Sequence, residues 1–260
     1  MAKENIIISD FDLFTDSMKA LVTTVGAAKF TINEAGLAIY GTAEKKIARC
    51  ELTTNAIYSN NPVEFSLMDL QKFVKILMTV KDIHEGDYSN FKFIYDAPFI
   101  KFESKKFKTK LHTDQFEKIE SWVSKKIETK MTPVFEFTTT SDMIKRINSH
   151  SFIFGGNTDD LRVYLETKAD MENNTLFATL GNKSTELNNE LTIKCGLVTL
   201  GKLEKTIILD LQRLNLFNAI PSDSIKISLM NVNVLVGKQK ILGKNDSYFC
   251  FDIYCGILKS

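Results

Sequence analysis

The sequence has no long run of apolar residues. No stretch of about 18 consecutive apolar side chains occurs in it, which is the length that a membrane-spanning helix needs. Its start, MAKENIIISD, also lacks the basic residues, apolar stretch and small-residue cleavage site of a secretory signal. We therefore expect an intracellular protein. The abundance of Lys, Asn and Ile and the lack of a basic nuclear-import cluster favour the cytoplasm of a bacterium or a phage-infected host, and the compartment would be the nucleus if the host is eukaryotic.

Cysteine and histidine are few and scattered. No C-x-x-C pair occurs, and no histidine has a partner at metal-ligand spacing. The sequence therefore predicts buried thiols, no metal and no cofactor. The residues concerned are Cys50, Cys195, Cys250, Cys255, His84, His112 and His150.

Catalytic motifs are missing as well. The sequence contains no G-x-x-x-x-G-K-[ST], no G-x-G-x-x-G and no G-x-S-x-G, which excludes the common phosphate cradles and the nucleophile elbow. A site assembled from distant residues would escape such a search, so an enzyme with a dispersed site stays open. We expect a protein that is not an enzyme.

Charge of one sign is not in excess either. The chain has 33 Lys and Arg against 32 Asp and Glu, for a net charge of +1. This balance excludes a protein that is basic all over, but it allows a local basic surface, because steering depends on how charge is distributed.

Alternating patterns predict strands along most of the chain. Segments such as FIKFE and IKISL alternate apolar and polar side chains, which is typical of strands with one buried face. Helical spacing of apolar residues interrupts this rhythm four times. The fold class is therefore α+β. The predicted helices are Asp12 to Val25, Met68 to Val80, Ser141 to Phe152 and Asp210 to Ile220.

The two halves of the chain repeat each other. MDLQKFVKIL from Met68 and LDLQRLNLFN from Leu209 share Asp-Leu-Gln followed by a basic residue, and strands flank both in the same order. Chance similarity of two amphipathic helices is the alternative. A repeat near half the chain length indicates a duplicated domain. We predict an N-terminal domain at 1–112, a charged, glycine-free linker at 113–133 and a C-terminal domain at 134–260.

Basic residues fall on the outer faces of all four predicted helices. Scattered lysines of this kind suit contacts to phosphates, which bind without sequence preference and permit sliding. They lack the clustered arginines and asparagines that read base edges. For any single helix, a solvated lysine face is the ordinary explanation. The basic side chains are Lys19, Lys72, Lys75, Lys145, Arg146, His150 and Arg213.

With these features the chain resembles the DNA sliding clamps, in particular proliferating cell nuclear antigen and the related phage clamps. The resemblance is carried by GLAIYGTAEKKIARCEL, FSLMDLQKFVKIL and LQRLNLFNAIPSDSIKISL, together with the duplicated half and the linker. It implies two domains per subunit and a homotrimer closed into a ring. Helices would line a hole that holds duplex DNA, and sheets would form the outer wall. The implied role is a processivity factor that tethers a DNA polymerase and is opened by an ATP-dependent clamp loader.

The resemblance also assigns roles to residues. Lys72 and Lys75 match DNA-facing lysines of the family, and the other basic residues named above are placed by helix position only. The strand from Lys106 to His112, with Lys106, Lys108 and Lys110, matches the family's subunit interface. Its expected partner is the strand from Thr175 to Leu180 of the next subunit, with Leu176, Ala178 and Leu180.

A pocket for partner peptides is implied beneath the linker, at Ile47, Trp122, Val123, Val234 and Tyr254. The linker departs from the family here, because Phe116, Ile119, Val123 and Ile127 are spaced as on a helix, whereas the family's linker is usually extended. Trp122 is either a lid on the pocket or a staple that holds the linker to the sheet.

One alternative of another class is a β-rich structural or assembly protein, such as a phage virion component, whose duplicated domain builds a scaffold without DNA.

Overall fold

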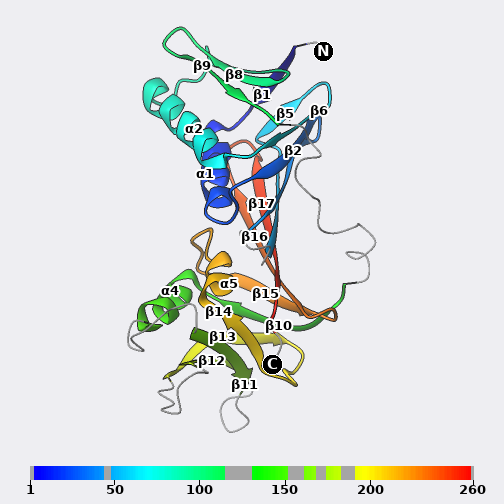
Figure 1. Cartoon of the computed structure of the whole chain (residues 1–260), viewed down its shortest axis with the longest axis vertical. Helices are drawn as coiled ribbons and strands as arrows, with labels where there is room; N and C mark the ends of the chain where they lie inside the picture. The colour runs from blue at the N-terminus through cyan, green and yellow to red at the C-terminus, as the bar shows by residue number, and fades with distance from the viewer. Residues whose placement is uncertain are drawn as a thin grey trace. The chain divides into compact units, whose positions relative to one another are not determined.

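The computed structural model describes residues 3–43, 48–114, 131–151, 161–167, 174–182 and 191–258. Within these ranges the fold is α+β, as predicted. The chain divides into two compact units (Figure 1). Unit 1 comprises Met1–Trp122 and Lys240–Asp252, and unit 2 comprises Val123–Gln239 and Ile253–Ser260. Residues 240–252 therefore group with unit 1, although they belong to the C-terminal half of the sequence, and the domain boundaries at 112 and 134 stay a prediction.

Unit 1 contains two antiparallel sheets and two helices that lie side by side (Figure 1). One sheet has the order β5-β1-β7-β8-β9, and the other has the order β6-β2-β3-β4 with β17 next to β4. The helices are α1 (Phe11–Val22) and α2 (Leu70–His84). The strands are β1 (Glu4–Ile8), β2 (Ala28–Asn33), β3 (Gly36–Thr42), β4 (Ala48–Thr54), β5 (Ile57–Ser59), β6 (Val63–Leu67), β7 (Lys92–Asp96), β8 (Phe99–Glu103) and β9 (Lys108–His112).

The core of unit 1 forms where α2 meets the sheets. Leu70, Phe73, Leu77 and Val80 recur at three- and four-residue spacing and are almost fully buried, as the sequence predicts. The ring of Phe73 lies at the centre of an aromatic cluster. Its centroid is 5.8 to 6.4 Å from the centroids of the neighbouring rings, those of Phe14, Phe30, Phe93 and Phe102.

Unit 2 has the sheet order β14-β11-β12-β13-β10-β15-β16, with helices α4 (Ser141–His150) and α5 (Leu211–Leu216). The strands are β10 (Pro133–Thr139), β11 (Leu161–Thr167), β12 (Thr175–Asn182), β13 (Leu191–Leu200), β14 (Ile207–Asp210), β15 (Ile225–Met230), β16 (Val234–Leu242) and β17 (Tyr248–Gly256). The hairpin strands β16 and β17 each have residues in both units.

The sequence repeat corresponds to one local structure that occurs twice. Asp69 and Asp210 are the N-caps of α2 and α5, and each carboxylate accepts a hydrogen bond from the N–H three residues later, at 2.9 Å from Lys72 and 2.7 Å from Arg213. The Asp of the repeat is therefore a helix cap, and it also suits the positive end of the helix dipole.

The second halves of the repeats differ. The helix α5 ends at Leu216, earlier than the predicted end at Ile220, because the chain continues in tighter turns. There the N–H groups of Phe217, Asn218 and Ala219 bond to carbonyls three residues back. In unit 2 one strand, β13, also takes the place of β4 and β5, which Asn55 and Ala56 separate in unit 1.

The free thiols agree in part with the prediction. Cys50, Cys195 and Cys255 are buried, and Cys250 is half-buried. Burial raises the pKa of Cys50 to about 11 and that of Cys195 to about 12, so both stay protonated at neutral pH. In the described ranges, no helix is long and apolar enough to cross a membrane.

Candidate nucleic-acid interface and sheet edges

The outer face of α2 carries two exposed lysines. Lys72 and Lys75 lie opposite the buried Phe73 and Leu77, one turn apart. Over the residues that the structure describes, neither ammonium group pairs with a carboxylate. These two side chains therefore present uncompensated positive charge to solvent, which is the chemistry that a phosphate backbone attracts.

The outer face of α1 is mixed in charge. Lys19 Nζ lies 3.3 Å from Asp16 Oδ1, and the two side chains are 42% and 62% exposed. An exposed pair of this kind is weak and is screened by salt. Lys19 is thus accessible, but it pairs with an acidic neighbour, whereas Lys72 and Lys75 have none within the described ranges.

The helix α4 presents two cations and one capping histidine. Lys145 and Arg146 are exposed, and Lys145 Nζ lies 3.6 Å from Asp142 Oδ1 in the first turn. His150 Nδ1 is 2.7 Å from the Arg146 carbonyl oxygen, so the imidazole closes the last turn of its own helix. Of the three predicted side chains, Lys145 and Arg146 point most freely into solvent.

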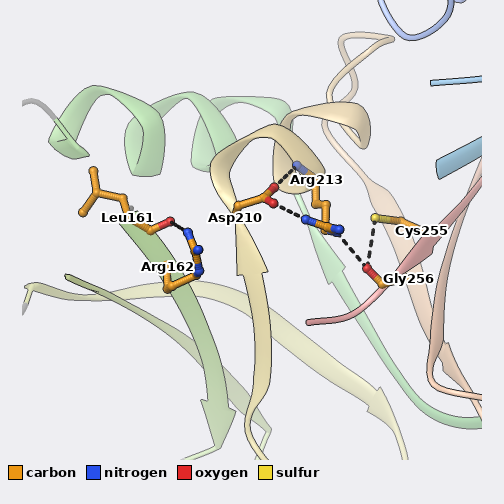
Figure 2. Close-up of polar contacts among 6 residues, drawn as sticks. All are labelled: Leu161, Arg162, Asp210, Arg213, Cys255 and Gly256. Carbon is orange, nitrogen blue, oxygen red and sulfur yellow. Dashed lines mark hydrogen bonds and ion pairs between the residues drawn. The ribbon is translucent and has the colours of Figure 1, made fainter. Parts of the chain in front are cut away.

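Arg213 does not have the outward position that the repeat predicted, and this is a correction. Its guanidinium forms an ion pair with Asp210, its Nε donates a 3.0 Å hydrogen bond to the Gly256 carbonyl, and its side chain is only 16% exposed. Figure 2 shows the side chain between the start of α5 and the end of β17. Arg213 therefore holds the C-terminal strand of unit 2 to α5, and its charge is neutralised.

The strand β9 lies at the edge of its sheet. In the described part of the chain it pairs with β8 alone, from Glu103↔Lys108 to Phe99↔His112. Lys108 and Lys110 are exposed on one face, and Leu111 is buried on the other. Lys106 lies just before the strand, where its Nζ is 3.5 Å from the Ile83 carbonyl oxygen. Charged side chains along an edge are a common protection against unwanted pairing.

The strand expected to pair with β9 is not an edge, and this prediction is also corrected. β12 is paired on both sides, with β11 and with β13, and its side chains at Leu176, Ala178 and Leu180 are fully buried. Among the described residues, the edge of this region is the first half of β13. Leu191, Thr192 and Ile193 pair with β12 on one side, whereas the pairing of β13 with β10 begins only at Leu197.

No family model matches the sequence. No curated protein matches it either. Solved structures do match over nearly the whole chain. Proliferating cellular nuclear antigen from Entamoeba histolytica is 16% identical, with 99% of each chain covered and a TM-score of 0.65. The PCNA2–PCNA3 complex from Sulfolobus tokodaii is 12% identical, with 98% of each chain covered and a TM-score of 0.59.

The chain has the fold of proliferating cell nuclear antigen. This confirms the resemblance at the level of architecture, because an α+β chain of two similar halves matches from end to end. In the order of its elements, α2 lies between β6 and β7, and α5 lies between β14 and β15.

The peptide pocket expected of a clamp fold is described only in part. Val234 and Tyr254 lie in unit 2, and both are half-buried. Ile47, Trp122 and Val123 lie outside the described residues, as do residues 115–130 of the predicted linker with their helical spacing. The pocket, and the role of Trp122 as lid or staple, stay predictions.

A metal centre was not predicted, and none of the described residues forms a cluster of three or more His, Cys, Asp or Glu side chains that could hold an ion.

Proposed function

We propose that the chain is a DNA sliding clamp, a non-enzymatic factor that encircles duplex DNA and tethers a polymerase to it. The observation that carries this proposal is the clamp fold, which extends over 99% of the chain. The exposed lysines of α2 and the two sheet edges support it.

The duplicated fold indicates how copies would join. Within unit 1, β17 lies next to β4, and Thr54 Oγ1 donates a 2.6 Å hydrogen bond to the Tyr248 carbonyl. β9 ends the first half of the chain as β17 ends the second, and β13 occupies the place of β4. We therefore propose that β9 of one copy pairs with the first half of β13 in the next. The contact is head to tail, and three such contacts would close a ring of three copies.

Lys72 and Lys75 of α2, with Lys145 and Arg146 of α4, would face the duplex. Lysines at the ends of flexible stems contact phosphates without fixing a sequence, so the ring would slide. Lys19 and His150 stay secondary candidates for this surface, and Arg213 stabilises it from inside.

The proposed partners are duplex DNA, a DNA polymerase, an ATP-dependent clamp loader and further copies of the chain. The polymerase would bind through a peptide at Val234 and Tyr254, with Ile47, Trp122 and Val123 completing the pocket. A clamp acts where DNA is replicated, in the cytoplasm of a bacterium or a phage-infected cell or in a eukaryotic nucleus.

Mass measurement and imaging of the purified chain test the proposal. We expect a three-copy species by sedimentation and, by negative-stain microscopy, a ring whose hole admits a duplex. A monomer at micromolar concentration, with no rings on circular DNA even when a loader is supplied, would contradict it.

A further inference from the structure

One hairpin tip of the chain seats on a helix N-terminus in unit 1. The β16–β17 tip spans residues 243–247 and is closed by a 2.8 Å hydrogen bond from the Gly243 N–H to the Ser247 carbonyl. The Ser247 hydroxyl and the Lys244 N–H donate to the same oxygen of Asp10, the N-cap of α1, at 2.9 and 3.0 Å. Lys244 Nζ lies 3.8 Å from Asp12 in the first turn.

The first half of the chain has an equivalent tip. Residues 104–107 join β8 to β9, and a 2.7 Å hydrogen bond from the Ser104 N–H to the Phe107 carbonyl closes this tip, which is one residue shorter than the tip at 243–247. Lys105 follows the donor of the closing bond, as Lys244 does, and Phe107 supplies the accepting carbonyl, as Ser247 does. Lys105 is exposed and Phe107 is half-buried.

Unit 2 has an equivalent seat for such a tip. Thr140 is the N-cap of α4, as Asp10 is of α1, so Asp142 corresponds to Asp12 and Met143 corresponds to Leu13. The seat is a hollow of about 390 Å³ at the start of α4. Leu197, a wall of this hollow, is 53% exposed, which is unusual for a leucine in a concave site. The residues around the hollow are Thr138–Thr140, Met143, Lys194–Leu197, Asp223 and Ser224.

The differences between the two tips match the differences between the two seats. In unit 1 a hydroxyl, Ser247, meets a carboxylate, Asp10. In unit 2 the N-cap is the uncharged Thr140, beside the apolar Met143 and Leu197, and the corresponding tip residue is the apolar Phe107. The ion pair between Lys244 and Asp12 has a counterpart of the same charges. Lys105 corresponds to Lys244, and Asp142, whose side chain is 92% exposed, corresponds to Asp12.

We propose that the β8–β9 tip of one copy seats in the hollow at the start of α4 in the next copy, with Phe107 filling the hollow and Lys105 beside Asp142. This inference rests on the proposed ring. It adds a side-chain anchor at the end of the β9–β13 contact. A buried aromatic ring in a fitted pocket is the type of contact that dominates interface affinity.

Cross-linking between two single-cysteine chains tests the contact directly. The native thiols Cys50, Cys195, Cys250 and Cys255 are first replaced by alanine, because Cys195 lines the hollow. Chains that then carry only Lys105→Cys or only Asp142→Cys are mixed and treated with a short bis-maleimide. We expect a two-chain product in the mixture and none from either variant alone. Lys105→Cys mixed with Lys202→Cys, an exposed position outside the hollow, is the matched control.

Substitution at Phe107 measures the anchor. Phe107→Ala should weaken association of the copies roughly 10- to 100-fold, whereas Phe107→Leu should weaken it less. Thermal unfolding of both variants at low concentration checks that unit 1 remains folded. A three-copy wild-type species that gives no cross-link and tolerates Phe107→Ala would overturn the anchor and leave the ring standing. A wild-type chain that never self-associates would overturn both.

Discussion

Lys81 Nζ on α2 lies 2.8 Å from Asp12 Oδ1 on α1, and this ion pair joins the two helices of unit 1. The hydrogen bond to Asp12 also raises the pKa of Lys81. The charge of Lys81 is therefore balanced inside the helix pair. Lys72 and Lys75, on the same helix, have no such carboxylate among the described residues, and these two lysines define the surface that the first prediction addresses.

Replacing Lys72 and Lys75 together by glutamate should reduce DNA-dependent stimulation of a polymerase and leave assembly intact. The reason is loss of phosphate contacts. Each lost contact makes the plot of log affinity against log salt concentration shallower by about one unit of slope. Primer-extension assays over a range of salt concentrations measure the effect, with sedimentation as the check on assembly. Lys202→Glu with Lys205→Glu makes the same charge change elsewhere and should have little effect. Unchanged stimulation in the Lys72 and Lys75 variant would mean that this face of α2 does not meet DNA.

Replacing Arg213 by alanine should destabilise unit 2 by about 1–3 kcal/mol, because Asp210 and the Gly256 carbonyl lose a charged hydrogen-bond donor. Denaturant unfolding gives the free energy of unfolding. Arg213→Lys keeps the charge but loses the planar fork of donors, so it should recover only part of the loss. If Arg213→Ala has normal stability but binds DNA more weakly, Arg213 contacts DNA after all.

Replacing Asp10 by asparagine should remove an acid-dependent part of the stability of unit 1. Burial alone would raise the pKa of Asp10, but hydrogen bonds from the N–H groups of Leu13 and Lys244 and from the Ser247 hydroxyl outweigh it and hold the pKa below its ordinary value. A lowered pKa in the folded state stabilises the protein above the unfolded pKa of about 3.9, and this contribution is lost as the pH falls through the folded pKa. Melting temperatures from pH 7 to pH 3 should show the wild type losing its advantage over the variant as the pH falls. A constant difference would argue against this role.

Replacing Phe73 by alanine should cost about 3–5 kcal/mol, since its ring is fully buried and lies among four other aromatic rings. Phe73→Leu leaves a smaller cavity and should cost less. Chemical denaturation compares the two. Equal stability of wild type and Phe73→Ala would mean that α2 is not packed as described.

Local signals in the sequence were enough to predict the helices and many strands. An apolar stripe at three- and four-residue spacing predicts α2, and alternation predicts β8 and β9. These helices and strands form because their apolar side chains are buried on one face, and the pattern of apolar residues that shows this is contained in a few neighbouring residues.

Relations between distant residues could not be predicted in this way. Lys72 follows Asp69 at the same spacing as Arg213 follows Asp210, yet only Arg213 turns inward. Its Nε donates to the Gly256 carbonyl, and because Gly256 lies 43 residues further along the chain, local sequence could not predict this contact. The edge assigned to Thr175–Leu180 was wrong for a related reason: whether a strand is central or at an edge depends on long-range pairing, here with both β11 and β13.

The hydrogen bond between Asp10 and the Lys244 N–H joins residues 234 positions apart, and it has a consequence for biosynthesis. The helices and most strands of unit 1 leave the ribosome first. The β16–β17 tip that contacts Asp10 and the strand β17 that lies next to β4 are among the last segments to be made. An unfinished chain that stops before Lys240 exposes β4 as an unpaired edge, which is open to other unfinished chains on the same messenger. The half of the protein that is translated first is thus completed last.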